Sequence, residues 1–209
     1  MESRTQLEEH LASARTSGNK AQIADALHAL GVVRQKAGEV ADAQALYEES
    51  LELRFALGDK AQVVNLLNLL GLMASAQHDH PRTRARFAEA ATLARAWANQ
   101  PGLARSLVNL GGVLCDAGDI ATALSLQKES LALRRALGDQ RGIAHSLTNL
   151  GDSAYREGYD AAAHAYLAES LTIGRSLEDA WAISGAASML GLLADRTLAA
   201  QTGTHRCAD

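Results

Sequence analysis

A Leu-Gly pair recurs every 40 residues along the whole chain, and this period constrains the fold more than any other feature. The pair occurs at Leu30-Gly31, Leu70-Gly71, Leu110-Gly111, Leu150-Gly151 and Leu190-Gly191, with no insertion between the copies. Glu-Ser-Leu recurs in the same phase at residues 49–51, 129–131 and 169–171. A fixed period of this length indicates a solenoid, in which each repeat is one supersecondary unit that packs on its neighbours.

Each unit of 40 residues is predicted to be a pair of helices. The leucines of the third unit recur at i, i+4, i+7 and i+11, which is one helical face: Leu103, Leu107, Leu110 and Leu114. Gly118 then ends that helix, because glycine adopts a left-handed conformation readily, and Asp119 can cap the next helix. With only two prolines and 4% aromatic residues, an all-β fold is disfavoured.

We call the helix with the Leu-Gly pair the first helix of a unit, and the helix after it the second helix. The chain opens with a second helix near residues 5–17 and closes with a first helix near 180–197, so about ten helices are expected. A glycine inside a helix costs roughly 1 kcal/mol relative to alanine. Its recurrence therefore predicts that the second helix of each unit packs closely against it. Residues 1–197 are predicted to form a single solenoid domain, and residues 198–209 a polar, disordered tail.

This pattern resembles the tetratricopeptide repeat (TPR), which has Leu-Gly in its first helix, a turn glycine seven residues later, and small residues 12 and 19 residues after the Leu-Gly glycine. Three units match: Gly31, Gly38, Ala43 and Ser50; Gly111, Gly118, Ala123 and Ser130; and Gly151, Gly158, Ala163 and Ser170. The period of 40 exceeds the usual 34, and the second unit has His78 for the turn glycine. The 40-residue form is similar to the TPRs of Pins/LGN spindle adaptors, kinesin light chains and large bacterial regulators. The resemblance implies an all-α, right-handed superhelical solenoid of antiparallel helix pairs.

Solenoids bind ligands along extended concave surfaces, which the first helices of a TPR line. Polar residues between the core positions of these helices are the candidate groove residues: Asn68, Arg105, Asn109, His145, Asn149, Asp152, Tyr155 and Arg156. An asparagine amide offers both a donor and an acceptor to a peptide unit. In the resembling proteins, groove asparagines hold a ligand backbone in this way, which implies a protein or peptide segment as partner. The alternative is that these asparagines bond to neighbouring helices or to water.

Catalytic signatures such as GxSxG, the Walker A loop and HExxH do not occur in the sequence. His78-Asp79-His80 could suggest a metal site, but a turn residue, a helix cap and the start of a helix explain it better. Neither His205 nor Cys207 in the tail forms a ligand set. We therefore expect no enzymatic activity, no cofactor and no metal. The net charge of −4 argues against a nucleic-acid surface, and the most apolar run, 63–76, is too short for a membrane span.

The sequence thus predicts a cytoplasmic scaffold or sensor module of a bacterial signal-transduction protein, which binds an extended or amphipathic segment in its groove. Two alternatives remain open at this stage. The last helix is apolar at Trp181, Ile183, Leu192 and Leu193, so the chain could assemble with itself, as a homodimer, through that helix. The third reading is a small-molecule binder or enzyme lined by His145, Asp152, Tyr155 and Arg156.

Overall fold

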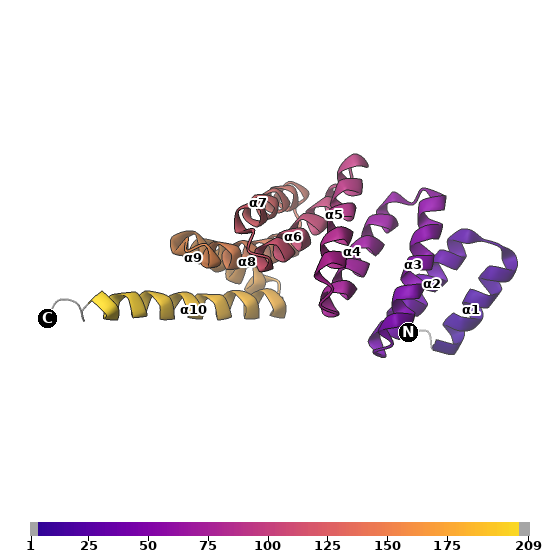
Figure 1. Cartoon of the computed structure of the whole chain (residues 1–209), viewed down its shortest axis with the longest axis horizontal. Helices are drawn as coiled ribbons and strands as arrows, with labels where there is room; N and C mark the ends of the chain where they lie inside the picture. The colour runs from indigo at the N-terminus through magenta and orange to yellow at the C-terminus, as the bar shows by residue number, and fades with distance from the viewer. Residues whose placement is uncertain (1–3, 205–209) are drawn as a thin grey trace. The chain divides into compact units, whose positions relative to one another are not determined.

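The computed structural model describes residues 4–204, which form ten α-helices and no strand (Figure 1). The first helices are α2 (Lys20–Lys36), α4 (Lys60–Ala76), α6 (Gln100–Asp116), α8 (Gln140–Arg156) and α10 (Ala180–Thr204). The second helices are α1 (Arg4–Ser17), α3 (Val40–Leu57), α5 (His80–Ala96), α7 (Ile120–Leu137) and α9 (Asp160–Ser176). The predicted all-α repeat of about ten helices is confirmed.

The helices group into two compact halves, the N-terminal half, Met1–Ser106, and the C-terminal half, Leu107–Asp209, and the boundary falls within α6. The predicted tail is wrong for its first part, because α10 continues through residues 198–204. The remaining residues, 205–209, lie outside the part of the chain that is described.

The turns between helices follow the repeat. Asp59 and Asp119 accept hydrogen bonds from the backbone N–H groups of Gln62 and Thr122, so each caps the helix that follows it. The turn within a unit places one residue at positive φ, which is +86° at Gly118 and +59° at His78. The turn therefore keeps its left-handed conformation in the second unit, although histidine replaces glycine there.

Four of the five recurring glycines lie beneath second helices, as predicted, and the fifth, Gly191, has no such cover. The glycines and the side chains that cover them are Gly31 with Tyr47, Gly71 with Phe87, Gly111 with Gln127, and Gly151 with Leu167. A Cβ atom added at any of these glycines would lie between 2.5 and 2.8 Å from the covering side chain. Only glycine allows such close packing of the two helices.

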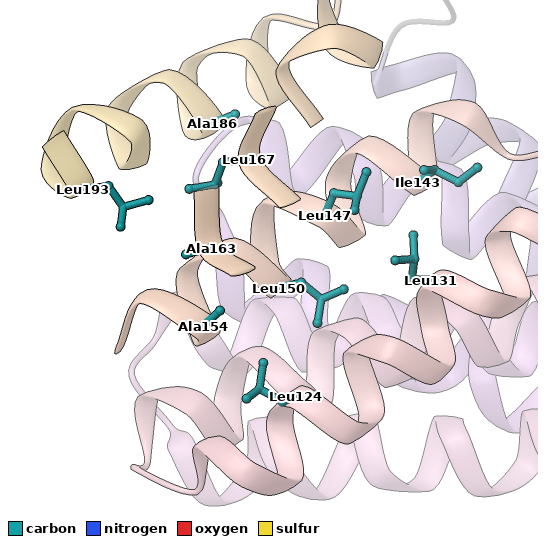
Figure 2. Close-up of a cluster of buried hydrophobic side chains, with 10 residues drawn as sticks. All are labelled: Leu124, Leu131, Ile143, Leu147, Leu150, Ala154, Ala163, Leu167, Ala186 and Leu193. Carbon is teal, nitrogen blue, oxygen red and sulfur yellow. The ribbon is translucent and has the colours of Figure 1, made fainter. Parts of the chain in front are cut away.

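The hydrophobic core of the C-terminal half is centred on α8. Side chains from four helices meet there (Figure 2): Leu124 and Leu131 of α7, Ile143, Leu147, Leu150 and Ala154 of α8, Ala163 and Leu167 of α9, and Ala186 and Leu193 of α10. Leu147, Leu150 and Leu167 have essentially no exposed surface. This packing on several sides holds α8 in place and determines which of its residues reach the surface.

Candidate functional site

From Gly142 to Ala154, the accessible surface of α8 is one narrow row of polar residues. Ten residues between Gly142 and Ala154 are buried, and between them only His145, Asn149 and Asp152 are partly exposed. Arg156 continues the same face at the exposed end of the helix. The spacing of 4, 3 and 4 residues places all four side chains on one helical stripe. We call His145, Asn149, Asp152 and Arg156 the α8 row.

At the C-terminal end of the α8 row, one guanidinium lies between two carboxylates. Arg156 Nε lies 3.1 Å from Asp152 Oδ2, and its Nη1 lies 3.0 Å from Asp116 Oδ1 of α6. Desolvation acts to lower the pKa of Arg156, but the hydrogen bond and the charge of Asp152 outweigh it, so the pKa is raised. Two carboxylates against one cation leave this end with an excess negative charge. It therefore favours a ligand that brings a cation or N–H donors.

At the N-terminal end, the side chain of His145 is held by residues from the start of α10. Its Nε2 lies 3.2 Å from Asp179 Oδ2, and Arg141 Nε lies 3.0 Å from the same oxygen. Asp179 also caps α10 by accepting the backbone N–H of Ala182, and this bond is the main reason that its pKa is lowered. The His145 ring packs against Trp181 with 4.5 Å between the ring centroids. Trp181 is 54% exposed, so an accessible aromatic surface adjoins the row.

Asn149 lies in the middle of the row and is half-buried. Its Nδ2 donates a hydrogen bond of 2.9 Å to the backbone oxygen of His145, one turn earlier in the same helix. The amide group has a second N–H and a carbonyl oxygen that this bond does not use. Asn149 can therefore still offer one donor and one acceptor to a ligand. Its counterpart on α6, Asn109, is also half-buried.

Tyr155 does not belong to the row, although it is next to Arg156 in sequence. The guanidinium carbon of Arg196 lies 3.7 Å from the centroid of the Tyr155 ring, and Arg196 also donates to the Tyr155 backbone oxygen. The Tyr155 ring packs against the hydrophobic core of the C-terminal half. Its role in the structure is thus to connect α8 with α10.

The other two candidates, Asn68 and Arg105, lie in the N-terminal half. Arg105 is exposed on α6 and donates to Asn65 Oδ1 at 3.1 Å. Asn68 is only 2% exposed, and its Nδ2 donates to Val64 O and to Ser106 Oγ. The prediction that Asn68 lines the groove is therefore wrong. Asn68 precedes the Asn149 slot of the repeat by one residue, and that step rotates its side chain by about 100° into the helix packing.

Sequence reasoning missed the contribution of Asp179, Arg141 and Trp181 to the site. Asp179 occupies the same repeat position as Asp59 and Asp139, and this position signals a helix cap but not a contact with the preceding first helix. The sequence indicates only that Trp181 lies on an apolar helix surface. No pattern within α8 could indicate that residues from the start of α10 hold His145.

Within the described residues, no three His, Cys, Asp or Glu side chains come together as a metal site. His78 and His80 have ring centroids 6.5 Å apart, and His205 and Cys207 lie outside the described residues. Among the helices described, none combines the length and apolar character that a membrane span needs.

These features define an all-α helical-repeat protein with a polar row along one of its first helices. The family model of the tetratricopeptide repeat matches residues 22–96, 62–136 and 102–176. The chain therefore belongs to the tetratricopeptide repeat family. A comparison with curated proteins finds no match.

Several crystal structures have a similar fold. BtubC (BKLC) from P. vanneervenii is 16% identical, with a TM-score of 0.74 over 97% of this chain and 91% of that chain. Aspartyl phosphate phosphatase F from Bacillus subtilis is 12% identical, with a TM-score of 0.79 over 90% of this chain and 50% of that chain. The nearly identical TPR-like repeats of the Podosopora anserina putative kinesin light chain are 14% identical to this chain, with a TM-score of 0.64 over 85% of this chain and 88% of that chain. At these identities the comparisons show the fold alone.

Proposed function

We propose that this chain is a non-enzymatic binding module that holds an extended protein or peptide segment along the α8 row. The observation that supports this most is the burial pattern of α8: from Gly142 to Ala154 the residues that reach the surface are all polar, and they share one stripe with Arg156. From His145 to Arg156 the row spans about 16 Å, at 1.5 Å per helical residue. An extended chain rises about 3.3 Å per residue, so a segment of about five residues would cover the row.

The two ends of the row define the chemistry of the segment. Near Arg156, the excess carboxylate of Asp116 and Asp152 favours a Lys or Arg side chain, or exposed amide donors. At the other end, Trp181 offers apolar and aromatic surface, which suits a hydrophobic side chain or a cation over the ring. Asn149 lies between these ends and can pair with a peptide unit. The ligand that fits best is a short segment with a basic residue at one end and an apolar residue at the other.

The side chains with reactive groups serve this arrangement better than they serve catalysis. His145 contacts Asp179 and Trp181, Tyr155 packs beneath Arg196, and Arg156 pairs with two carboxylates. Each contact fixes the position of a side chain in or beside the row. We infer a scaffold or sensor role of the kind that the TPR resemblance implies.

The experiment uses peptides selected from a random phage-displayed library on the wild-type protein. The affinity of a selected peptide is then measured by calorimetry for wild type, Asn149→Ala, and the double variant Asn109→Ala with Asn149→Ala. A lost amide contact costs about 1–3 kcal/mol in a dry site, so Asn149→Ala should weaken binding about tenfold, and the double variant at least as much.

The matched control is Lys128→Ala, an exposed position on the second helix α7, which should leave the affinity unchanged. All variants should melt within a few degrees of wild type, because alanine forms helices well. Wild-type affinity in the double variant would refute the proposal. Loss of the fold in that variant would show instead that the asparagines are structural.

A further inference from the structure

Helix α10 is the first helix of the last repeat, and no second helix covers it within the described residues, in contrast to the first helices before it. A Cβ atom built at Gly191 would meet nothing within 4 Å, in contrast to the glycines at the same position in the other four units. Four small residues of α10 are exposed or have no neighbour: Ala187, Ser188, Gly191 and Ala194. Their counterparts on α8, 40 residues earlier, are all buried: Leu147, Thr148, Gly151 and Ala154.

A cavity of about 490 Å³ adjoins this face. Leu190, Leu193 and Ala194 of α10 line it on one side, and Ala161 and His164 of α9 on the other. A volume of this size accepts several side chains. We call the four small residues of α10 and this cavity together the end face.

The chain does not fold back to cover the end face within the described residues. Position 198, which corresponds to the turn residues His78, Gly118 and Gly158, is Leu198, and it lies inside the helix. The helix continues to Thr204, so α10 extends past α9 as a single helix (Figure 1). Among the described residues, no helix of this chain occupies the position of a second helix on the end face.

The four covered units show what such a helix must carry. A bulky side chain lies on the glycine in each unit: Tyr47, Phe87, Gln127 or Leu167. Three residues later comes a small residue with no exposed surface: Ser50, Ala90, Ser130 or Ser170. The hydroxyls of Ser50 and Ser170 donate to backbone oxygens of the first helix, at 2.9 and 2.8 Å. Only a small side chain fits at that position.

A charge on α9 adds a second requirement. Arg15 and Arg135 each contact a glutamate on the next second helix, Glu49 and Glu169, at 2.7 Å. Arg175 occupies the corresponding position on α9 and is exposed. In the described part of the chain, no acidic side chain pairs with Arg175. A helix on the end face would therefore meet Arg175 with a glutamate directly before its small residue.

We propose that the end face docks a helix of another protein, in the place that a second helix takes in the other units. The docking helix carries a bulky residue, a glutamate two residues later and a serine or alanine directly after that. A second copy of this chain fits poorly, because the second helix with an open side is α1, and it places His10 where Ser50 is fully buried. This site is separate from the α8 row, so either proposal can fail alone.

The probe is a fluorescently labelled peptide with the sequence of α3, residues 40–57, which contains Tyr47, Glu49 and Ser50. The changes Ala41→Lys and Ala45→Asp, joined by a lactam on the exposed face of α3, keep the peptide helical. Binding is followed by anisotropy with the full chain. Gly191→Leu fills the space above the glycine, so it should weaken binding at least tenfold.

Gly112→Leu is the matched control, because a Cβ atom at Gly112 also meets nothing within 4 Å and lies on α6. It should leave the affinity unchanged. The peptide change Ser50→Arg should abolish binding. Arg175→Glu should weaken binding about threefold to fivefold, as expected for an exposed ion pair, and the peptide change Glu49→Arg should restore that loss.

Three results would overturn the proposal. The first is no binding of the wild-type protein to the peptide at concentrations up to about 1 mM, where a contact worth −4.1 kcal/mol would be half-saturated. The second is equal binding to wild type and Gly191→Leu. The third is self-association of wild type in sedimentation that Gly191→Leu abolishes, which would make a second copy the natural occupant.

Discussion

Replacing a glycine by leucine should have opposite effects at Gly71 and Gly191, although both belong to the same repeat position. At Gly71 a new Cβ atom would lie 2.5 Å from Cε1 of Phe87, which is 2% exposed. Overpacking costs about 1–3 kcal/mol, and displacing the phenyl ring forfeits about 1.5–3 kcal/mol of burial. The gain in helix propensity returns only about 0.8 kcal/mol. Gly71→Leu should therefore destabilise the protein by about 2–5 kcal/mol.

At Gly191 the same change meets no neighbour, so only the gain in helix propensity remains, and stability should rise by about 0.5–1 kcal/mol. For a chain of this size, 1 kcal/mol shifts Tm by about 2–4 °C. Thermal melts followed by far-UV circular dichroism should thus show a fall of about 4–20 °C for Gly71→Leu and a small rise for Gly191→Leu. Equal losses at both positions, or a Gly71→Leu protein as stable as wild type, would refute the assignment of helix contacts.

Three further predictions concern a turn and two ionisable groups. His78 has a φ of +59°, a conformation that costs a non-glycine residue about 1–2 kcal/mol, so His78→Gly should raise Tm; an unchanged or lower Tm would count against the strained turn. Burial raises the pKa of Tyr47 to about 12, above the unfolded value of about 10, so the neutral ring stabilises the fold fully below about pH 10. In urea melts this stabilisation should disappear between about pH 10 and 12 for wild type, and the variant Tyr47→Phe should show no such loss. The pKa of Asp179 is lowered mainly by the backbone N–H of Ala182, and further by His145 and Arg141. The charged carboxylate therefore stabilises the fold above about pH 4, and this stabilisation is lost as the pH falls through the pKa in the folded state. The stability of Asp179→Asn should thus fall less steeply at acid pH than that of wild type.

Most of the fold could be predicted from the sequence, because each local signal recurs with the same period. The turn glycine, the Asn or Asp cap and the apolar face of each helix recur in most units, so the helix boundaries near 20, 40, 60 and 80 follow directly. The end of α10 was predicted less well. The turn residue is replaced by Leu198, followed by alanines, and these good helix formers let the helix continue to Thr204.

The candidate site was only partly predictable, because a helical stripe depends on phase and on neighbours far away in sequence. The spacing of His145, Asn149, Asp152 and Arg156 identified the accessible stripe of α8 correctly. A difference of one position placed Asn68 inside the packing instead. The contact of Tyr155 with Arg196 joins residues 41 positions apart, and no local pattern encodes such a contact.

The most direct test of the binding proposal is whether a bound peptide touches Asn149. In NMR spectra of the ¹⁵N-labelled protein, the Nδ2 amide signals of Asn149 are assigned by comparison with Asn149→Ala, and the indole N–H signal of Trp181 with Trp181→Phe. Addition of a selected peptide should shift both sets of signals. The side-chain amide signals of Gln127, which is buried on α7 and only 1% exposed, should not shift. A saturated complex in which the Asn149 signals do not move would contradict the assignment of the α8 row as the binding site.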